Sequence, residues 1–180
     1  MPMKTFLLGL LFGLAVLPAA AYLFLRLGYA PVAVASPPFP LERQMARMAL
    51  HARIAKEAPA QSPVPASEPN LLVGAKLYRE HCAVCHGLAG EPPTATAKGM
   101  FPRPPKLMEG KGVTDDPVGE IYWKAANGIR LTGMPGYRGP LNDEQLWQVS
   151  QVLLNADKLP DSVRQQLVIS APAKQLRAIE

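Results

Sequence analysis

Two thiols and an imidazole stand within five consecutive residues of this chain. The segment reads Cys82-Ala83-Val84-Cys85-His86 and contains both cysteines of the 180-residue sequence. It is a C-x-x-C-H pattern, the attachment signature of c-type haem. Because residues i and i+3 lie on one face of a helix, both thiols can reach the two vinyl groups on one edge of a porphyrin. The following imidazole, His86, is then placed to ligate iron from one side.

Three interpretations of the same motif need no haem. A C-x-x-C redox motif of the thioredoxin kind requires a βαβ pattern, which the sequence lacks. A structural zinc site requires four ligands; His81, Cys82, Cys85 and His86 would supply them, but from six residues that fit a closed tetrahedron poorly. A disulfide between the two cysteines would close a small, strained loop. At the level of the motif, these alternatives stay open.

A haem iron that carries electrons needs a second axial ligand, and methionine is a common one. Three methionines follow the motif, namely Met100, Met108 and Met134. Met134 lies in a segment, 127–136, with glycine and proline on both sides, so a loop there can present its thioether inward. A buried methionine is usually a core filler, and we interpret Met100 and Met108 in this way.

Helices are expected on both sides of the motif. The segment from Asn70 to His81 is predicted to be helical, and Gly74 on its apolar side would let another helix approach closely. That apolar side consists of Leu71, Gly74, Ala75, Tyr78 and Cys82. A second helix is expected to follow Asp116-Pro117, with the aspartate as cap and the proline at the first helical position.

The helix after Leu141 is expected to pack against the helix before the motif. Asn142 and Gln145 have the spacing of a capping box at its start. Its apolar side consists of Leu146, Val149, Val152 and Leu153. Near the end of the chain, Leu159-Pro160-Asp161 predicts the start of a further short helix.

The N-terminal segment is apolar enough to cross a bilayer. Twenty residues without a charge run from Phe6 to Leu25, between Lys4 and Arg26, and such a helix spans about 30 Å. A signal peptide cleaved after Ala21 would leave a hydrophobic new terminus. We therefore favour an uncleaved transmembrane anchor over residues 1–27, with a signal peptide as the alternative.

Residues 28–69 are expected to form a proline-rich spacer with a helix at about 41–57. Most apolar residues of that helix fall on one side of a helical wheel, but Leu50 and Ile54 do not lie on that side. The apolar side consists of Leu41, Met45, Met48, Ala49, Ala52 and Ala55. Arg43, Arg47, Arg53 and Lys56 make the helix basic, which fits an anionic membrane surface or a partner, or equally a solvated spacer. His51 is interpreted as a surface residue.

Composition excludes several classes of protein. Two cysteines are too few for a disulfide-rich scaffold, although 20 prolines in 180 residues are about twice the usual share. The formal net charge is +5, but residues 70–180 carry 13 basic and 11 acidic side chains, a net of +2. Because no basic stripe is interleaved with aromatic residues, we expect no nucleic acid partner.

Several segments together resemble class I bacterial monohaem cytochromes c. They are Gly74-Ala75-x-Leu77-Tyr78, the C-x-x-C-H motif followed by Gly87, Phe101-Pro102-Arg103-Pro104-Pro105-x-Leu107, Asn127-Gly128, Gly133-Met134-Pro135 and Leu141-Asn142-Asp143-Glu144-Gln145-Leu146-Trp147. The resemblance covers about residues 71–154. It implies a small all-α cytochrome c domain, over residues 70–165, wrapped round one covalently bound haem c. Residues 166–180 are then expected to form a C-terminal tail.

The resemblance also implies the roles of four residues. Cys82 and Cys85 are implied as the thioether positions, His86 as the proximal ligand and Met134 as the distal ligand of the iron. In the family, a carbonyl of the proline-rich loop fixes the proximal ring, which points to Pro104 or Pro105 here. Candidates for binding the haem propionates are Arg103, Trp123 and Arg130.

The implied function is electron transfer, not catalysis. In that family, haem is attached on the outer face of the bacterial inner membrane, so we expect a single-pass protein with a periplasmic domain. Redox proteins in or on the membrane would be its partners, with no small-molecule substrate. Two alternatives are a cytochrome subunit docked on a dehydrogenase or terminal oxidase, and a haem sensor or ligand binder from which Met134 dissociates.

Overall fold

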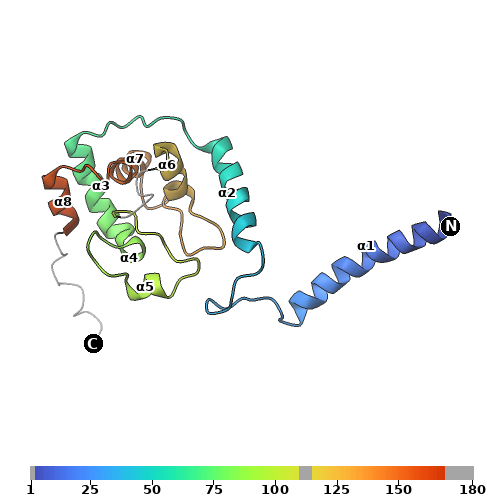
Figure 1. Ribbon diagram of the computed structural model, residues 1–180. Coiled ribbons are helices and arrows are strands. Elements are labelled where there is room, and N and C mark those ends of the chain that lie inside the picture. The colour runs from blue at the N-terminus through green and yellow to red at the C-terminus, as the bar shows by residue number, and fades with distance from the viewer. Residues whose placement is uncertain (1–2, 110–114, 169–180) are drawn as a thin grey trace. The chain divides into compact units, whose positions relative to one another are not determined.

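The structure is a computed structural model that describes residues 3–109 and 115–168. Every regular element within these ranges is a helix (Figure 1). This confirms the all-α class, and the thioredoxin-like alternative has no strand to support it in the described ranges. The chain divides into two compact units, Met1–Arg47 and Met48–Glu180.

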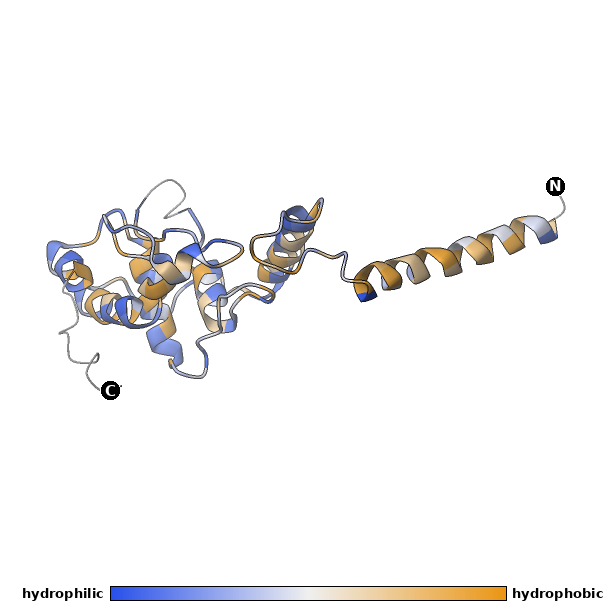
Figure 2. Cartoon of the chain, turned by 90° about the horizontal axis from the view of Figure 1, so that it is seen from below, coloured by the Kyte–Doolittle hydropathy of each residue, from blue (hydrophilic) through white to orange (hydrophobic). Residues whose placement is uncertain are grey.

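The first unit contains α1, which runs from Met3 to Arg26 and includes Pro18. Its 24 residues correspond to about 36 Å of helix, and none of its described side chains is buried. Figure 2 shows hydrophobic residues along the length of this helix. By length and composition α1 can cross a bilayer. A transmembrane anchor and an N-terminal signal sequence both fit this description.

The core of the second unit forms where α3 (Glu68–His81) crosses α7 (Asp143–Leu154). Gly74 lies at the crossing, because a Cβ atom added there would lie 2.2 Å from the carbonyl oxygen of Gln148. Tyr78 on α3 and Val152 on α7 are completely buried. The expected packing of these two helices is therefore confirmed, together with the reason for a small residue in α3.

On its other side, α7 packs against α6 (Val118–Asn127). The rings of Tyr122 and Trp147 stack there at 4.0 Å between centroids, and the Tyr122 hydroxyl donates to the Asp143 carboxylate. The predicted capping box is present, since Asn142 and Gln145 each accept the other's backbone N–H at 2.9 Å.

The predicted start of α6 is wrong by one residue. Pro117 itself occupies the N-cap position, and no side chain caps the helix. The Asp116 carboxylate instead accepts a hydrogen bond from the Lys124 ammonium at 2.8 Å. That ion pair links the segment before the helix to its last turn, so Asp116 does not act as the cap.

The helix expected at about 41–57 is α2, which runs from Glu42 to Glu57. Its buried residue is Ile54, with 4% of its surface exposed, whereas Met48 is 67% exposed. The helical wheel therefore did not identify the side of α2 that is buried. Docking of the exposed apolar side on a membrane or partner stays a prediction, and His51 is exposed as expected.

The C-terminal end of α2 and the segment after it contact α6. Trp123 donates its indole N–H to the Glu57 carboxylate at 3.1 Å. A Cβ atom on Gly119 would lie 1.6 Å from the carbonyl oxygen of Pro59. Further along, the Gln151 amide donates to the Val64 carbonyl at 2.7 Å. Part of the segment expected to be spacer is thus packed against the helices of the second unit.

The last described helix is α8, which runs from Asp161 to Val168 and starts where the sequence predicted. Val163 and Leu167 are buried, and the helix packs against α3. Residues 166–168, expected to be tail, are therefore the last residues of α8. The rest of the expected tail, 169–180, lies outside the described residues.

Candidate cofactor site

The C-x-x-C-H motif forms one tight turn after α3. Cys82 ends α3, donating its backbone N–H to the Tyr78 carbonyl at 2.8 Å. The Cys82 carbonyl then accepts the backbone N–H groups of Cys85 at 3.1 Å and His86 at 2.9 Å, which starts α4 (Ala83–His86). Both cysteines are free and half-buried. The two thiols and the imidazole therefore come from a single helical turn.

Two tyrosines hold this turn at its ends. The buried Tyr78 donates its hydroxyl to the Gly87 carbonyl at 2.7 Å. Tyr137 donates its hydroxyl to the His81 carbonyl at 2.7 Å, and its ring lies edge-on to the His81 ring at 5.8 Å. Sequence reasoning missed the second contact, because Tyr137 lies 56 residues from His81 and belongs to none of the motifs.

The environment of Cys82 favours the neutral thiol. Burial raises the pKa of Cys82 to about 12, and the neighbouring Cys85 adds to the increase. A thiol that acts as a nucleophile in disulfide exchange needs the opposite, a lowered pKa. Among the described residues, no group of three or more His, Cys, Asp and Glu side chains is placed to hold a metal ion. The thiol-redox and zinc interpretations thus have no support in this geometry.

The His86 ring is fixed by the proline-rich loop. Its Nδ1 atom lies 2.8 Å from the carbonyl oxygen of Pro105. A carbonyl only accepts hydrogen bonds, so Nδ1 carries the proton and Nε2 keeps its lone pair. Burial lowers the pKa of His86, against the opposing effect of this hydrogen bond, which favours the neutral imidazole that metals bind. Of the two prolines expected, Pro105 is the partner.

Met134 is half-buried in a closed loop that follows α6. The Ile129 N–H donates to the Met134 carbonyl at 3.2 Å, and the Met134 N–H donates to the Thr132 hydroxyl at 3.1 Å. Gly128, at φ 68°, starts the loop, and a Cβ atom there would lie 2.6 Å from the backbone nitrogen of Gly136. Thr132 is a second residue that sequence reasoning missed.

The two other methionines have different surroundings. Met108 is buried in the hydrophobic core, as predicted. Met100 is half-buried and lies outside that core cluster. Its methyl carbon contacts Gly133, since a Cβ atom on that glycine would lie 2.0 Å from it. Met100 therefore packs beside the loop of Met134 and is not the core filler expected.

The structure also tests one of the propionate candidates. Because the Trp123 indole N–H already donates to Glu57, Trp123 is not available to bind a propionate. Arg103 and Arg130 are exposed and stay predictions.

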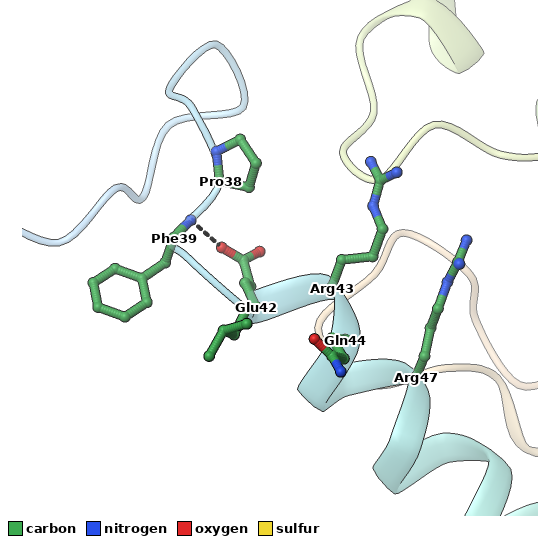
Figure 3. A pocket seen from close by; sticks show the side chains of 7 residues that line it. Pro38, Phe39, Glu42, Arg43, Gln44 and Arg47 are labelled. Atoms are coloured by element: carbon green, nitrogen blue, oxygen red, sulfur yellow. Dashed lines mark hydrogen bonds between the residues drawn. The ribbon is translucent and has the colours of Figure 1, made fainter.

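A shallow surface depression occurs in the first unit, at the start of α2 (Figure 3). It is lined in part by Phe39, Arg43 and Arg47. The Glu42 carboxylate accepts the Phe39 N–H at 2.8 Å on its edge. The side chains that line it include no cysteine, histidine or methionine, so this depression is separate from the chemistry of the C-x-x-C-H turn.

The donor set of the turn fits a covalently bound haem. It offers two free thiols for thioether bonds and an imidazole whose Nδ1 proton is given to Pro105, which leaves the Nε2 lone pair for a metal. Ala83 within the turn and Leu88, two residues after it, are half-buried against the core, and Leu131 in the loop of Met134 is 94% exposed. A flat apolar macrocycle with one metal would use each of these features.

Comparison with known proteins relates this chain to a family of cytochromes. Residues 69–151 match the family model of cytochrome c oxidase, cbb3-type, subunit III. No curated protein matches the chain. A chain in the reducing HAO-like protein complex of Kuenenia stuttgartiensis is similar, with 22% sequence identity and a TM-score of 0.48. The match covers 56% of this chain and 49% of that chain, so this chain spans about half of its length.

Proposed function

Residues 69–151 are a c-type cytochrome domain, and from this premise we propose that the chain is a membrane-tethered electron-transfer protein with one covalently bound haem c. The observation that carries the proposal is the C-x-x-C-H turn itself. It combines two free thiols with an imidazole whose Nδ1 atom donates to Pro105 at 2.8 Å. That hydrogen bond is the outer contact that metal-bound histidines usually make.

Four residues hold the haem in this proposal. Cys82 and Cys85 would form the two thioether bonds, and His86, through Nε2, and Met134, through its thioether, would be the ligands of the iron. When bound, the haem supplies a one-electron couple at its iron. A methionine ligand favours a higher reduction potential than a second histidine would. With both side chains as ligands, no position at the iron would be open to a substrate, so in this proposal the chain carries electrons and has no catalytic residue of its own.

The proposed location follows from α1. The helix anchors the chain in the bacterial inner membrane by a single pass, and the cytochrome domain lies on the periplasmic side, where haem is attached in this class of protein. The partners are redox proteins of the same membrane, such as members of a respiratory chain. A basic sequence before the domain favours the vicinity of anionic lipid.

A second candidate is a cytochrome subunit of a larger membrane oxidoreductase. The family whose model matches is named for a subunit of a terminal oxidase, which favours this alternative over a haem sensor. Gentle detergent extraction followed by size analysis separates the two, because a free carrier elutes alone and a subunit elutes with its complex. Carbon monoxide binding to the reduced protein would indicate the sensor instead.

The proposal is tested in membranes from cells that express the haem-attachment machinery. We expect the chain to stain for haem on a denaturing gel, and the reduced-minus-oxidised spectrum to be that of a c-type cytochrome. Cys82→Ser together with Cys85→Ser should abolish the stain. Val84→Ala, an exposed position in the same turn, is the matched control and should keep it. A wild-type chain that is present but unstained would contradict the proposal.

A further inference from the structure

The loop that carries the Pro105 carbonyl, residues 101–109, is held mainly by side chains. Within the described ranges, no backbone-to-backbone hydrogen bond outside the helices involves these residues. Pro102, Pro104 and Pro105 have no N–H to donate. Met108 is buried, which fixes one point of the loop. Something further must hold the Pro105 carbonyl against the imidazole.

Lys106 and Glu109 tie this loop to the segment that follows the C-x-x-C-H turn. Glu109 accepts the Gly90 backbone N–H through Oε2 at 2.8 Å. Lys106 donates to the Glu91 carbonyl at 3.3 Å and pairs with the other oxygen of Glu109. Gly90 and Glu91 are the fourth and fifth residues after His86. Lys106 follows Pro105 directly, so these contacts begin one residue from the carbonyl that His86 uses.

We propose that Lys106 and Glu109 are positioning residues that hold the Pro105 carbonyl on Nδ1 of His86 and thereby set the reduction potential of the haem. The inference rests on the proposed function. Neither side chain contacts the ligating atoms, and both act through the loop and the imidazole. A hydrogen bond from Nδ1 makes a metal-bound imidazole a stronger donor, which favours the oxidised iron and keeps the potential lower.

The predicted effect is on the potential more than on stability. Lys106 and Glu109 are both partly exposed, and such ion pairs contribute little to the stability of a fold. A longer or lost hydrogen bond at Nδ1, by contrast, changes the electron density at the iron directly. The two roles can therefore be separated by measuring the potential and the unfolding midpoint on the same variants.

The test is a spectroelectrochemical titration of the purified full chain in detergent. Lys106→Met and Glu109→Ala should each shift the midpoint potential to more positive values. Lys106→Arg keeps the positive charge and the N–H donors at this position, and should have the wild-type potential. Asp161→Ala is the matched control, because Asp161 forms an exposed i,i+3 ion pair with Arg164, far along the chain from the loop, and it should leave the potential unchanged.

A second readout follows the imidazole itself. In the reduced protein, the His86 Nδ1 proton should exchange with solvent faster in Lys106→Met and Glu109→Ala than in the wild type or Asp161→Ala. If both loop variants bind haem and keep the wild-type potential and exchange rate, the inference is overturned. If Glu109→Ala does not acquire haem, Glu109→Gln replaces it, and its midpoint potential and Nδ1 exchange rate test the inference in the same way. A wild-type chain without covalent haem would overturn the proposed function itself.

Discussion

The backbone of Met134 is held within its own loop by Ile129 and by the Thr132 hydroxyl. Replacing Met134 with alanine should abolish the methionine-to-iron charge-transfer absorbance at the red end of the oxidised spectrum, because no thioether then ligates the iron. The matched control is Met100→Ala, since Met100 packs against the adjacent Gly133. Persistence of the band in Met134→Ala, or its loss in Met100→Ala alone, would contradict the assignment.

Glu109 makes an acid-sensitive contribution to stability. Its pKa is lowered by the hydrogen bond from Lys106 and next by the Gly90 N–H. A carboxyl whose pKa is lower in the folded than in the unfolded state stabilises the fold above its ordinary pKa, and this contribution is lost as the pH falls through the folded value.

The wild type should therefore be more stable than Glu109→Gln near neutral pH, and the difference should shrink in acid. Thermal unfolding midpoints of the two proteins across that pH range check this prediction. A difference that stays constant down to the most acidic pH, or grows there, would show that the carboxylate charge is not responsible.

Among the elements, α3 and α7 could be predicted from the sequence because their signals are local. Apolar residues that recur every three or four positions indicate both helices. For α7, a capping box formed by two residues three positions apart, Asn142 and Gln145, also marks the start. The C-x-x-C-H turn is equally local. The contact of Glu57 with Trp123 could not be predicted, because the two residues lie 66 positions apart in the chain. In the sequence, Lys106 and Glu109 have the spacing of an ordinary surface i,i+3 ion pair. Their contacts with Gly90 and Glu91 depend on the fold and could not be predicted.

The burial of Ile54, on the same helix as the exposed Met48, predicts a measurable asymmetry along α2. Ile54→Ala should lower the free energy of unfolding by about 3 kcal/mol, the usual effect of truncating a buried aliphatic side chain. Met48→Ala, at a position 67% exposed, should change it by less than about 0.5 kcal/mol. Denaturant unfolding of the haem-loaded chain measures both, and equal effects at the two positions would contradict the packing described.

At the scale of the whole molecule, the proline excess has two different uses. Eight prolines fall between Pro31 and Pro69, and eight between Pro92 and Pro140. The first group lies in the segment expected to be a spacer, yet Pro59 packs its carbonyl against Gly119. The second group includes Pro105, whose carbonyl fixes His86. Composition alone indicates loops and linkers, whereas only the fold distinguishes a free linker from a segment that is packed on the domain.

The intact mass of the chain, purified from membranes, tests the central claim most directly. We predict the mass of the polypeptide plus one haem, with residues 1–21 retained as the anchor. The same mass without haem, or with more than one, would contradict a single covalently attached haem. A haem-bearing chain that lacks its first 21 residues would keep the electron-transfer function and contradict the uncleaved anchor.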